Sequence, residues 1–202
     1  MRRWGYHLRE FSDKLRKLEK LCRELYPKDD VHGWGHVERV RKLSRMLARN
    51  QKANLEALEA AALLHDIGRG SENHAEVSAQ KAEEILRNLG FPEEFIEKVV
   101  EAVRSHSFSR GRDPRSLEAK VLSDADKLDA MGAIGVFRAA AYGDRIGRGI
   151  DGLIKHAEEK LLKLRDLMCT KTGRGLAERR HRFLEEYLEE LKRELEEIEK
   201  EF

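Results

Sequence analysis

The sequence predicts an all-α protein, a bundle of roughly seven to nine helices. Three observations support this prediction. Through most of the 202 residues, apolar side chains recur every three or four positions, which is the period of an amphipathic helix. Turn signals built from Gly, Pro, Ser and Asn are separated by segments of helix length. No segment alternates apolar and polar residues in the way that a half-buried strand requires.

In chain order, the first well-defined helix is predicted over residues 34–49, with an apolar stripe along one side. The second is predicted over residues 55–67, because Asn54 is a favourable N-cap and Gly68 can end the helix. Breaks between helices are expected at residues 27–35, 68–73, 90–92, 109–114, 143–152 and 173–175.

The later elements follow from the same signals. Pro92 suits the first turn of a helix, so a helix is expected from there to about His106. Residues 117–129 again carry apolar side chains at helical spacing. The last helix is predicted from Leu176 to Lys200, and its mostly charged end predicts a solvated tail. Its apolar side is expected to carry Leu176, Phe183, Leu184, Tyr187, Leu188, Leu191, Leu195 and Ile198.

Length and composition favour a single soluble domain over residues 1–202. The 40 Lys and Arg residues balance 38 Asp and Glu, so no polycationic surface for nucleic acid or an anionic membrane is expected. No apolar run has transmembrane length, and no apolar segment follows the basic N-terminus as in a signal peptide. Cys22 and Cys169 lie far apart, which favours a reducing compartment. We therefore expect a cytoplasmic protein, a monomer or homodimer, without nucleic-acid or membrane partners.

Three predicted helices begin or end their apolar stripe with a histidine. His36 lies one turn before Val40, His65 ends the stripe of the second helix, and His106 ends that of the helix after Pro92. A single inward histidine is more often a core residue whose ring bonds a backbone carbonyl. Three of them at the edges of the core indicate a shared site.

Asp66 directly follows His65 inside an apolar run. A buried carboxylate is costly unless it is paired or binds a cation. Imidazole nitrogens and carboxylate oxygens without thiolates argue against a structural zinc site, and they fit a catalytic Mn, Mg, Fe, Co or Ni ion that keeps water sites. A further carboxylate is expected from residues 123–129, where helical spacing leaves Asp124 and Asp126 as alternatives.

These residues form a pattern similar to the H…HD…D signature of the HD-domain metal-dependent phosphohydrolases. Residues 32–40 (HGWGHVERV) resemble the H-x-W-x-H-x-x-R-V segment of that superfamily, and residues 60–68 (AAALLHDIG) resemble its A-A-L-L-H-D-I-G helix. Residues 124–135 (DADKLDAMGAIG) resemble a segment of a small bacterial branch that contains (deoxy)nucleoside triphosphate diphosphatases. The resemblance implies a single HD domain with its core at about residues 26–180 and residues 181–202 as the end of the last helix.

The resemblance also implies a ligand set. It selects Asp126 rather than Asp124 as the last ligand. Asp66 is expected to orient or deprotonate the nucleophile as well, and Arg69 to stabilise developing negative charge. The implied ligands of one divalent ion (Mn, Mg, Ni, Co or Fe) are His36, His65, Asp66 and Asp126.

His74 and His106 fall where binuclear members of the superfamily carry two more histidines. The favoured expectation is that both hold substrate phosphate over a single metal ion. The alternatives are a second ion bridged by Asp66, or that His74 merely begins a helix. The other candidates for substrate contacts are His32, Lys127, Lys160, Arg174 and Arg180.

The expected reaction is attack of metal-bound water on the α-phosphorus of a nucleoside triphosphate, giving monophosphate and pyrophosphate. A phosphodiesterase or a nucleotide phosphomonoesterase with the same metal site is an alternative. So is a non-catalytic module that binds metal or nucleotide. The glycine-rich stretch 143–152 is shorter than the corresponding loop of many relatives, so the resemblance does not carry over a base preference.

Overall fold

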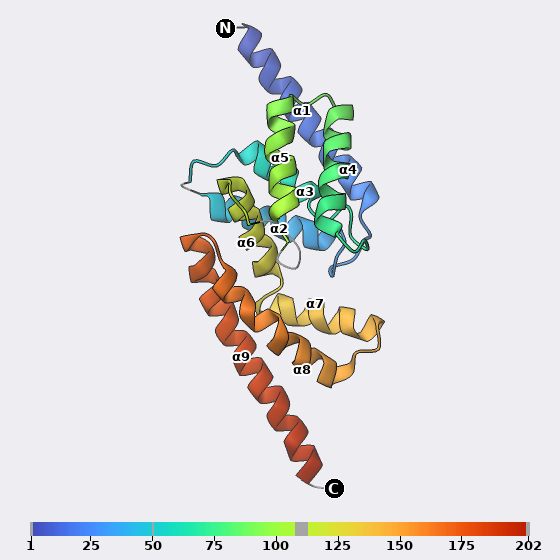
Figure 1. Cartoon of the computed structure of the whole chain (residues 1–202), viewed down its shortest axis with the longest axis vertical. Coiled ribbons are helices and arrows are strands. Elements are labelled where there is room, and N and C mark those ends of the chain that lie inside the picture. Colours follow the sequence, from blue (N-terminus) through green and yellow to red (C-terminus); the bar gives the residue numbers. More distant parts are fainter. Residues whose placement is uncertain (1, 50, 108–112, 201–202) are drawn as a thin grey trace. The chain divides into compact units, whose positions relative to one another are not determined.

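The computed structural model describes residues 2–49, 51–107 and 113–200, and all regular structure within these ranges is helical (Figure 1). The nine α-helices and one 3-10 helix of this part of the chain confirm the all-α prediction. Their bounds are α1 Arg2–Leu25, α2 Trp34–Ala48, α3 Leu55–Leu64, α4 His74–Asn88, α5 Glu93–Ser105, α6 Leu117–Asp129, α7 Gly132–Arg145, α8 Gly149–Glu159, η1 Leu161–Leu167 and α9 Lys171–Lys200.

The end of α3 differs from the prediction. Asn54 caps the helix as expected, since its side chain accepts a hydrogen bond from the Ala57 amide. The helix nevertheless stops at Leu64 and not at residue 67. In a continued helix the Ala62 carbonyl oxygen would accept a hydrogen bond from the backbone amide four residues later. Here the same oxygen lies 2.9 Å from Nδ1 of the His65 ring, which takes the place of that amide. The chain continues in tight turns, which carry His65 and its neighbour out of the helix.

One predicted break is absent from the structure, and another lies mostly outside the described residues. The break at residues 173–175 was wrong, because α9 begins at Lys171 and Thr170 caps it by accepting from the Gly173 amide. The hydroxyl cap offsets the low helix propensity of the glycines in the first turn. Most of the break predicted at residues 109–114 lies outside the described residues.

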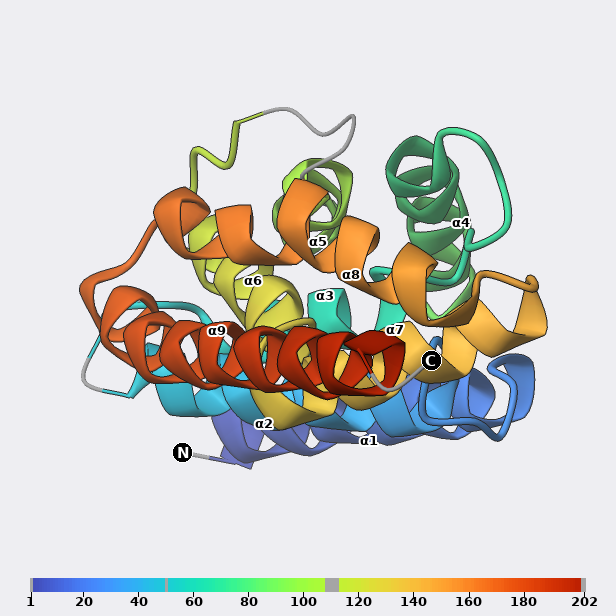
Figure 2. The same ribbon diagram turned by 90° about the horizontal axis from the view of Figure 1, so that it is seen from below.

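Residues 1–126 and 127–202 form two compact units. In the first unit α3 is the central helix and packs against α1, α2, α4 and α5. It can do so because its sequence, LEALEAAALL, is apolar almost all round, and its alanines let neighbouring helices approach closely. Helices α4 and α5 lie side by side in both views (Figures 1 and 2).

In the second unit α9 packs against α7 and η1, and α8 packs against both of these. The buried stripe of α9 is Gly173, Ala177, His181, Leu184 and Leu188. Two residues expected on the apolar side are largely exposed instead, Phe183 at 41% and Ile198 at 60%. The charged C-terminal end of α9 extends beyond α7 and α8, as its composition predicts (Figure 1).

The prediction of a single domain over residues 1–202 stays a prediction. Within the described ranges, every helix is too short or too polar to cross a lipid bilayer.

Candidate metal centre

All four predicted metal ligands lie close together in the first unit. His36 is the third residue of α2, His65 and Asp66 occupy the turn after α3, and Asp126 lies near the end of α6. Nε2 of His36 is 3.1 Å from Nε2 of His65 and 3.5 Å from Oδ1 of Asp126. These distances let His36, His65 and Asp126 share one ion.

The two carboxylate oxygens of Asp66 face different histidines. Oδ2 lies 3.8 Å from Nε2 of His36. Oδ1 lies 3.9 Å from Nε2 of His74 and 3.9 Å from Nε2 of His106. A second group of potential ligands, Asp66, His74 and His106, therefore adjoins the first. His74 does begin α4, but its ring also reaches the cluster.

The rings of two histidines are oriented in the same way, each by a hydrogen bond to the backbone carbonyl oxygen three residues earlier. His65 follows the last residue of α3, and its Nδ1 lies 2.9 Å from the Ala62 carbonyl oxygen. His106 follows α5 in the same way, and its Nδ1 lies 2.6 Å from the Val103 carbonyl oxygen. A ring nitrogen next to a carbonyl must carry the proton and donate, so Nε2 keeps its lone pair for a cation.

Two hydrogen bonds, one just before α3 and one just after α5, hold α6 and thereby place Asp126. The Asn54 amide, just before α3, donates to Glu118 of α6 at 2.6 Å. Ser123 of α6 donates to the carbonyl oxygen of His106 at 3.0 Å. Because residues three apart are neighbours on a helix surface, Asp126 falls beside Ser123 and next to the histidines. Asp124, the other alternative, is fully buried inside α6 and is not part of either group.

The electrostatics of the cluster suit a divalent cation. Burial by itself would raise the pKa of the Asp66 carboxyl, but the surrounding imidazoles, His65 first, and the Arg69 guanidinium hold that pKa below its usual range. The imidazoles likewise lower the pKa of Asp126 against the effect of burial. Burial lowers the pKa of His106 to about 4. Ionised carboxylates beside the uncharged His106 imidazole, with further imidazole nitrogens around them, are the donor set that such an ion takes, so the residues fit the implied metal.

Arg69 and His32, which the sequence predicts to act on the substrate, lie next to the cluster. Nη1 of Arg69 donates to both oxygens of Asp66, at 3.0 and 3.3 Å. Nη2 of the same guanidinium is 3.3 Å from Nε2 of His32. The side chain of Arg69 is 42% exposed, so it also faces solvent.

The loop before α2 explains the glycines around His32. Oδ1 of Asp29 accepts hydrogen bonds from the amides of residues 31–33, and the Arg39 guanidinium binds both the side chain and the carbonyl of Asp30. A Cβ on Gly33 would lie 2.1 Å from a backbone oxygen of this loop, so only glycine fits there. Arg39, in the motif at residues 32–40, thus positions the loop that carries His32.

Sequence reasoning assigned no role to Tyr26. This side chain is buried, and burial together with the nearby Asp66 carboxylate raises the pKa of its phenol well above the usual value. Tyr26 lies one residue beyond α1 and directly before the predicted break at residues 27–35, so helical periodicity gives no signal for it.

Four predicted substrate residues belong to residues 127–202. Lys127 is buried in α6, and Lys160 follows α8. Arg174 donates to the carbonyl oxygens of Met168 and Cys169, and Arg180 donates to that of Leu128. Both arginines therefore also have a structural part in this unit.

Several known proteins resemble this chain in sequence and in fold. The HD domain family matches residues 33–131. The uncharacterised protein YpgQ of Bacillus subtilis is 35% identical over 173 residues, which cover 81% of this chain and 84% of YpgQ. The crystal structure of YpgQ in complex with ADP has a TM-score of 0.78 at 29% identity, covering 92% of this chain and 96% of that one.

A crystal structure of an HD-superfamily hydrolase from Bacillus thuringiensis has a TM-score of 0.73 at 34% identity, and the match covers 92% of this chain and 98% of that one. The ordered His and Asp residues, the helical fold and these similarities agree. This chain belongs to the HD-domain family, as a small HD-superfamily hydrolase similar to YpgQ.

Proposed function

We propose that this protein is a divalent-metal-dependent phosphohydrolase that cleaves nucleoside triphosphates into monophosphate and pyrophosphate. The observation that carries the proposal is the cluster of imidazole and carboxylate groups at His36, His65, Asp66 and Asp126. The similar protein YpgQ was crystallised with ADP, which supports a nucleotide as the substrate.

The chain's own groups divide the work around the ion. A bound divalent ion supplies a Lewis acid for phosphoryl oxygens and lowers the pKa of water. Asp66, ionised at neutral pH, orients the attacking water by accepting a hydrogen bond on a carboxylate oxygen. Arg69 pairs with the negative charge that develops on the phosphoryl oxygens, because its guanidinium adjoins Asp66 and faces solvent.

His74 and His106 are proposed to hold substrate phosphate beside a single ion. The two oxygens of Asp66 support a second ion equally well, since Oδ1 faces these histidines and Oδ2 faces His36. Metal analysis of the reconstituted protein separates the two arrangements. One ion per chain, unchanged in His74→Ala, supports phosphate binding, whereas two ions that fall to one in His74→Ala support the binuclear site.

The deciding experiment is activity of metal-stripped protein restored with Mn, Mg, Co or Ni on a panel of nucleotides, with products identified by phosphorus NMR. Monophosphate plus pyrophosphate from triphosphates, lost in Asp66→Ala, supports the proposal. Asp124→Asn is the matched control, because Asp124 is buried in the same helix as Asp126 and lies outside both ligand groups. Release of orthophosphate from monophosphates, or turnover of cyclic nucleotides alone, would contradict the proposed reaction. Either result would indicate an esterase that acts through the same metal site.

Lys127, Lys160, Arg174 and Arg180 stay predicted substrate contacts. Single alanine substitutions test them through KM for the nucleotide.

A further inference from the structure

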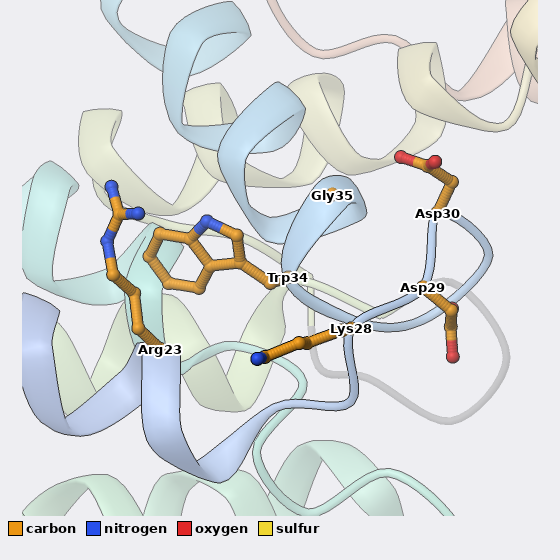
Figure 3. A pocket seen from close by; sticks show the side chains of 6 residues that line it. All are labelled: Arg23, Lys28, Asp29, Asp30, Trp34 and Gly35. Carbon is orange, nitrogen blue, oxygen red and sulfur yellow. The ribbon is translucent and has the colours of Figure 1, made fainter.

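A cavity of about 380 Å³ lies beside the loop that precedes α2 (Figure 3). Its volume falls in the range of roughly 300–1,000 Å³ that is usual for small-molecule sites. Trp34 and His36 are two positions apart on α2, so their side chains leave the helix about 200° apart. The described lining of the cavity includes none of the four predicted metal ligands. The cavity is lined by Arg23, Lys28, Asp29, Asp30, Trp34 and Gly35.

The two carboxylates of this cavity are already used by the loop itself. Oδ1 of Asp29 accepts from three successive backbone amides at 2.8–3.0 Å. Oδ1 of Asp30 binds the Arg39 guanidinium at 2.9 Å. Figure 3 shows the Asp29 carboxylate pointing away from the Trp34 ring. One oxygen of each carboxylate is therefore already engaged within the loop.

The donors, by contrast, are available. Within the described part of the chain, the Lys28 ammonium has no ion-pair or hydrogen-bond partner, and neither does the Trp34 indole N–H. The Arg23 guanidinium lies 4.6 Å from the centroid of the Trp34 ring, and its Nε and Nη2 both donate to one carboxylate oxygen of Glu19, at 3.3 and 2.9 Å, so its Nη1 is the donor that a ligand can use. Lys28 and Arg23 flank the indole in Figure 3. Two cations beside a half-buried indole that lines the cavity select an anion that carries a ring.

We propose that this Trp34 cavity is a second small-molecule site that binds a nucleotide, with its phosphate on Lys28 and Arg23 and its ring against the indole. Aromatic side chains stack on any nucleobase, because every base presents a π-face. The cation of Arg23 already covers part of the indole, so the phosphate of the ligand meets a positive charge next to the stacking surface. The proposal does not depend on the reaction at the metal centre.

The test uses the intrinsic fluorescence of Trp34. The chain has two tryptophans, so Trp4→Phe leaves Trp34 as the reporter. AMP is titrated with EDTA present, and also into the same protein carrying Asp66→Ala, so that the metal centre is disabled in both cases. We expect a saturable change in fluorescence. Lys28→Ala should weaken AMP binding about tenfold, because a charge-assisted hydrogen bond is lost. Inorganic phosphate and adenosine should each bind more weakly than AMP.

The matched control is Lys20→Ala, which removes the same charge from an exposed position of α1 outside the cavity. It should leave AMP binding unchanged, and the melting temperatures of both variants should match that of the parent. A response to AMP that fails to saturate would overturn the proposal, as would equal effects of the two lysine substitutions. A response that disappears with EDTA or Asp66→Ala would assign it to the metal centre and would also overturn the separate site.

Discussion

At the scale of single residues, Arg69 is the cation that contacts the predicted metal ligand Asp66. It donates to both carboxylate oxygens of Asp66, and its guanidinium also reaches His32. We predict that Arg69→Ala lowers kcat/KM about 100-fold, the usual loss when one donor to a developing oxyanion is removed. Arg69→Lys keeps the charge without the planar fork and should recover only part of the activity. Steady-state kinetics with quantified pyrophosphate measure both values.

The metal content of these variants shows whether the effect is catalytic. Arg69 is not a metal ligand, and removing a cation beside Asp66 does not weaken the attraction of that carboxylate for a metal ion. Bound metal should therefore equal that of the parent protein. If Arg69→Ala loses metal in proportion to activity, the residue maintains the ligand cluster and the catalytic role is wrong.

The two cysteines should differ sharply in reactivity. Cys22 is fully buried. Burial, with a smaller contribution from the negative charge of Glu19, raises the pKa of its thiol to about 12. At pH 8 only about one such thiol in ten thousand is the reactive thiolate. Cys169 is half-buried. We predict that a disulfide reagent modifies one thiol per native chain quickly and the second only after unfolding. Cys169→Ser should abolish the fast reaction, and two fast thiols would contradict this.

Sequence reasoning worked for residues at the ends of apolar stripes and failed for residues between helices. His36, His65 and His106 stand out because a polar side chain on an apolar face is costly without a partner. Asp126 needed the family resemblance, since helical spacing favoured Asp124 equally. Tyr26 lies in a break between helices, where burial depends on the tertiary fold and leaves no period in the sequence.

At the scale of elements, the predicted ends of α3 and α9 were wrong for local reasons. A histidine side chain takes the carbonyl that α3 needs to continue, and a threonine hydroxyl starts α9 ahead of two glycines. Both devices replace a backbone hydrogen bond with a side-chain one, so propensity and periodicity cannot detect them. At α3 the same device also orients His65, so the early end of the helix serves the site.

The metal centre joins three elements of the first unit, α2, α6 and the turn between α3 and α4. We predict that Mn²⁺ raises the melting temperature of metal-stripped protein, since an ion that binds only the folded state at 100 times its Kd adds about 2.7 kcal/mol. Asp126→Ala removes a ligand from α6 and should abolish most of this gain. Calorimetry with and without metal measures it, and an equal gain in the variant would place the ion elsewhere.

At the scale of the whole molecule, α6 is the element that continues from one compact unit into the other. It runs from Leu117 to Asp129, and the boundary falls between Asp126 and Lys127. Its last residue is fully buried in the second unit, where Asp129 pairs with Arg138 at 3.0 Å. The same helix thus carries a metal-site carboxylate and, one turn later, a buried ion pair.

The single-domain prediction can be tested through this pair. Arg138→Met breaks the buried ion pair with Asp129, and breaking such a pair typically costs up to about 3–5 kcal/mol. If the chain unfolds as one domain, the loss must appear in both units. In the Trp4→Phe background, we expect the Trp34 fluorescence transition, which reports the first unit, to move down together with the helical signal in circular dichroism. A dichroism transition that splits while the Trp34 transition stays in place would mean that residues 127–202 unfold independently.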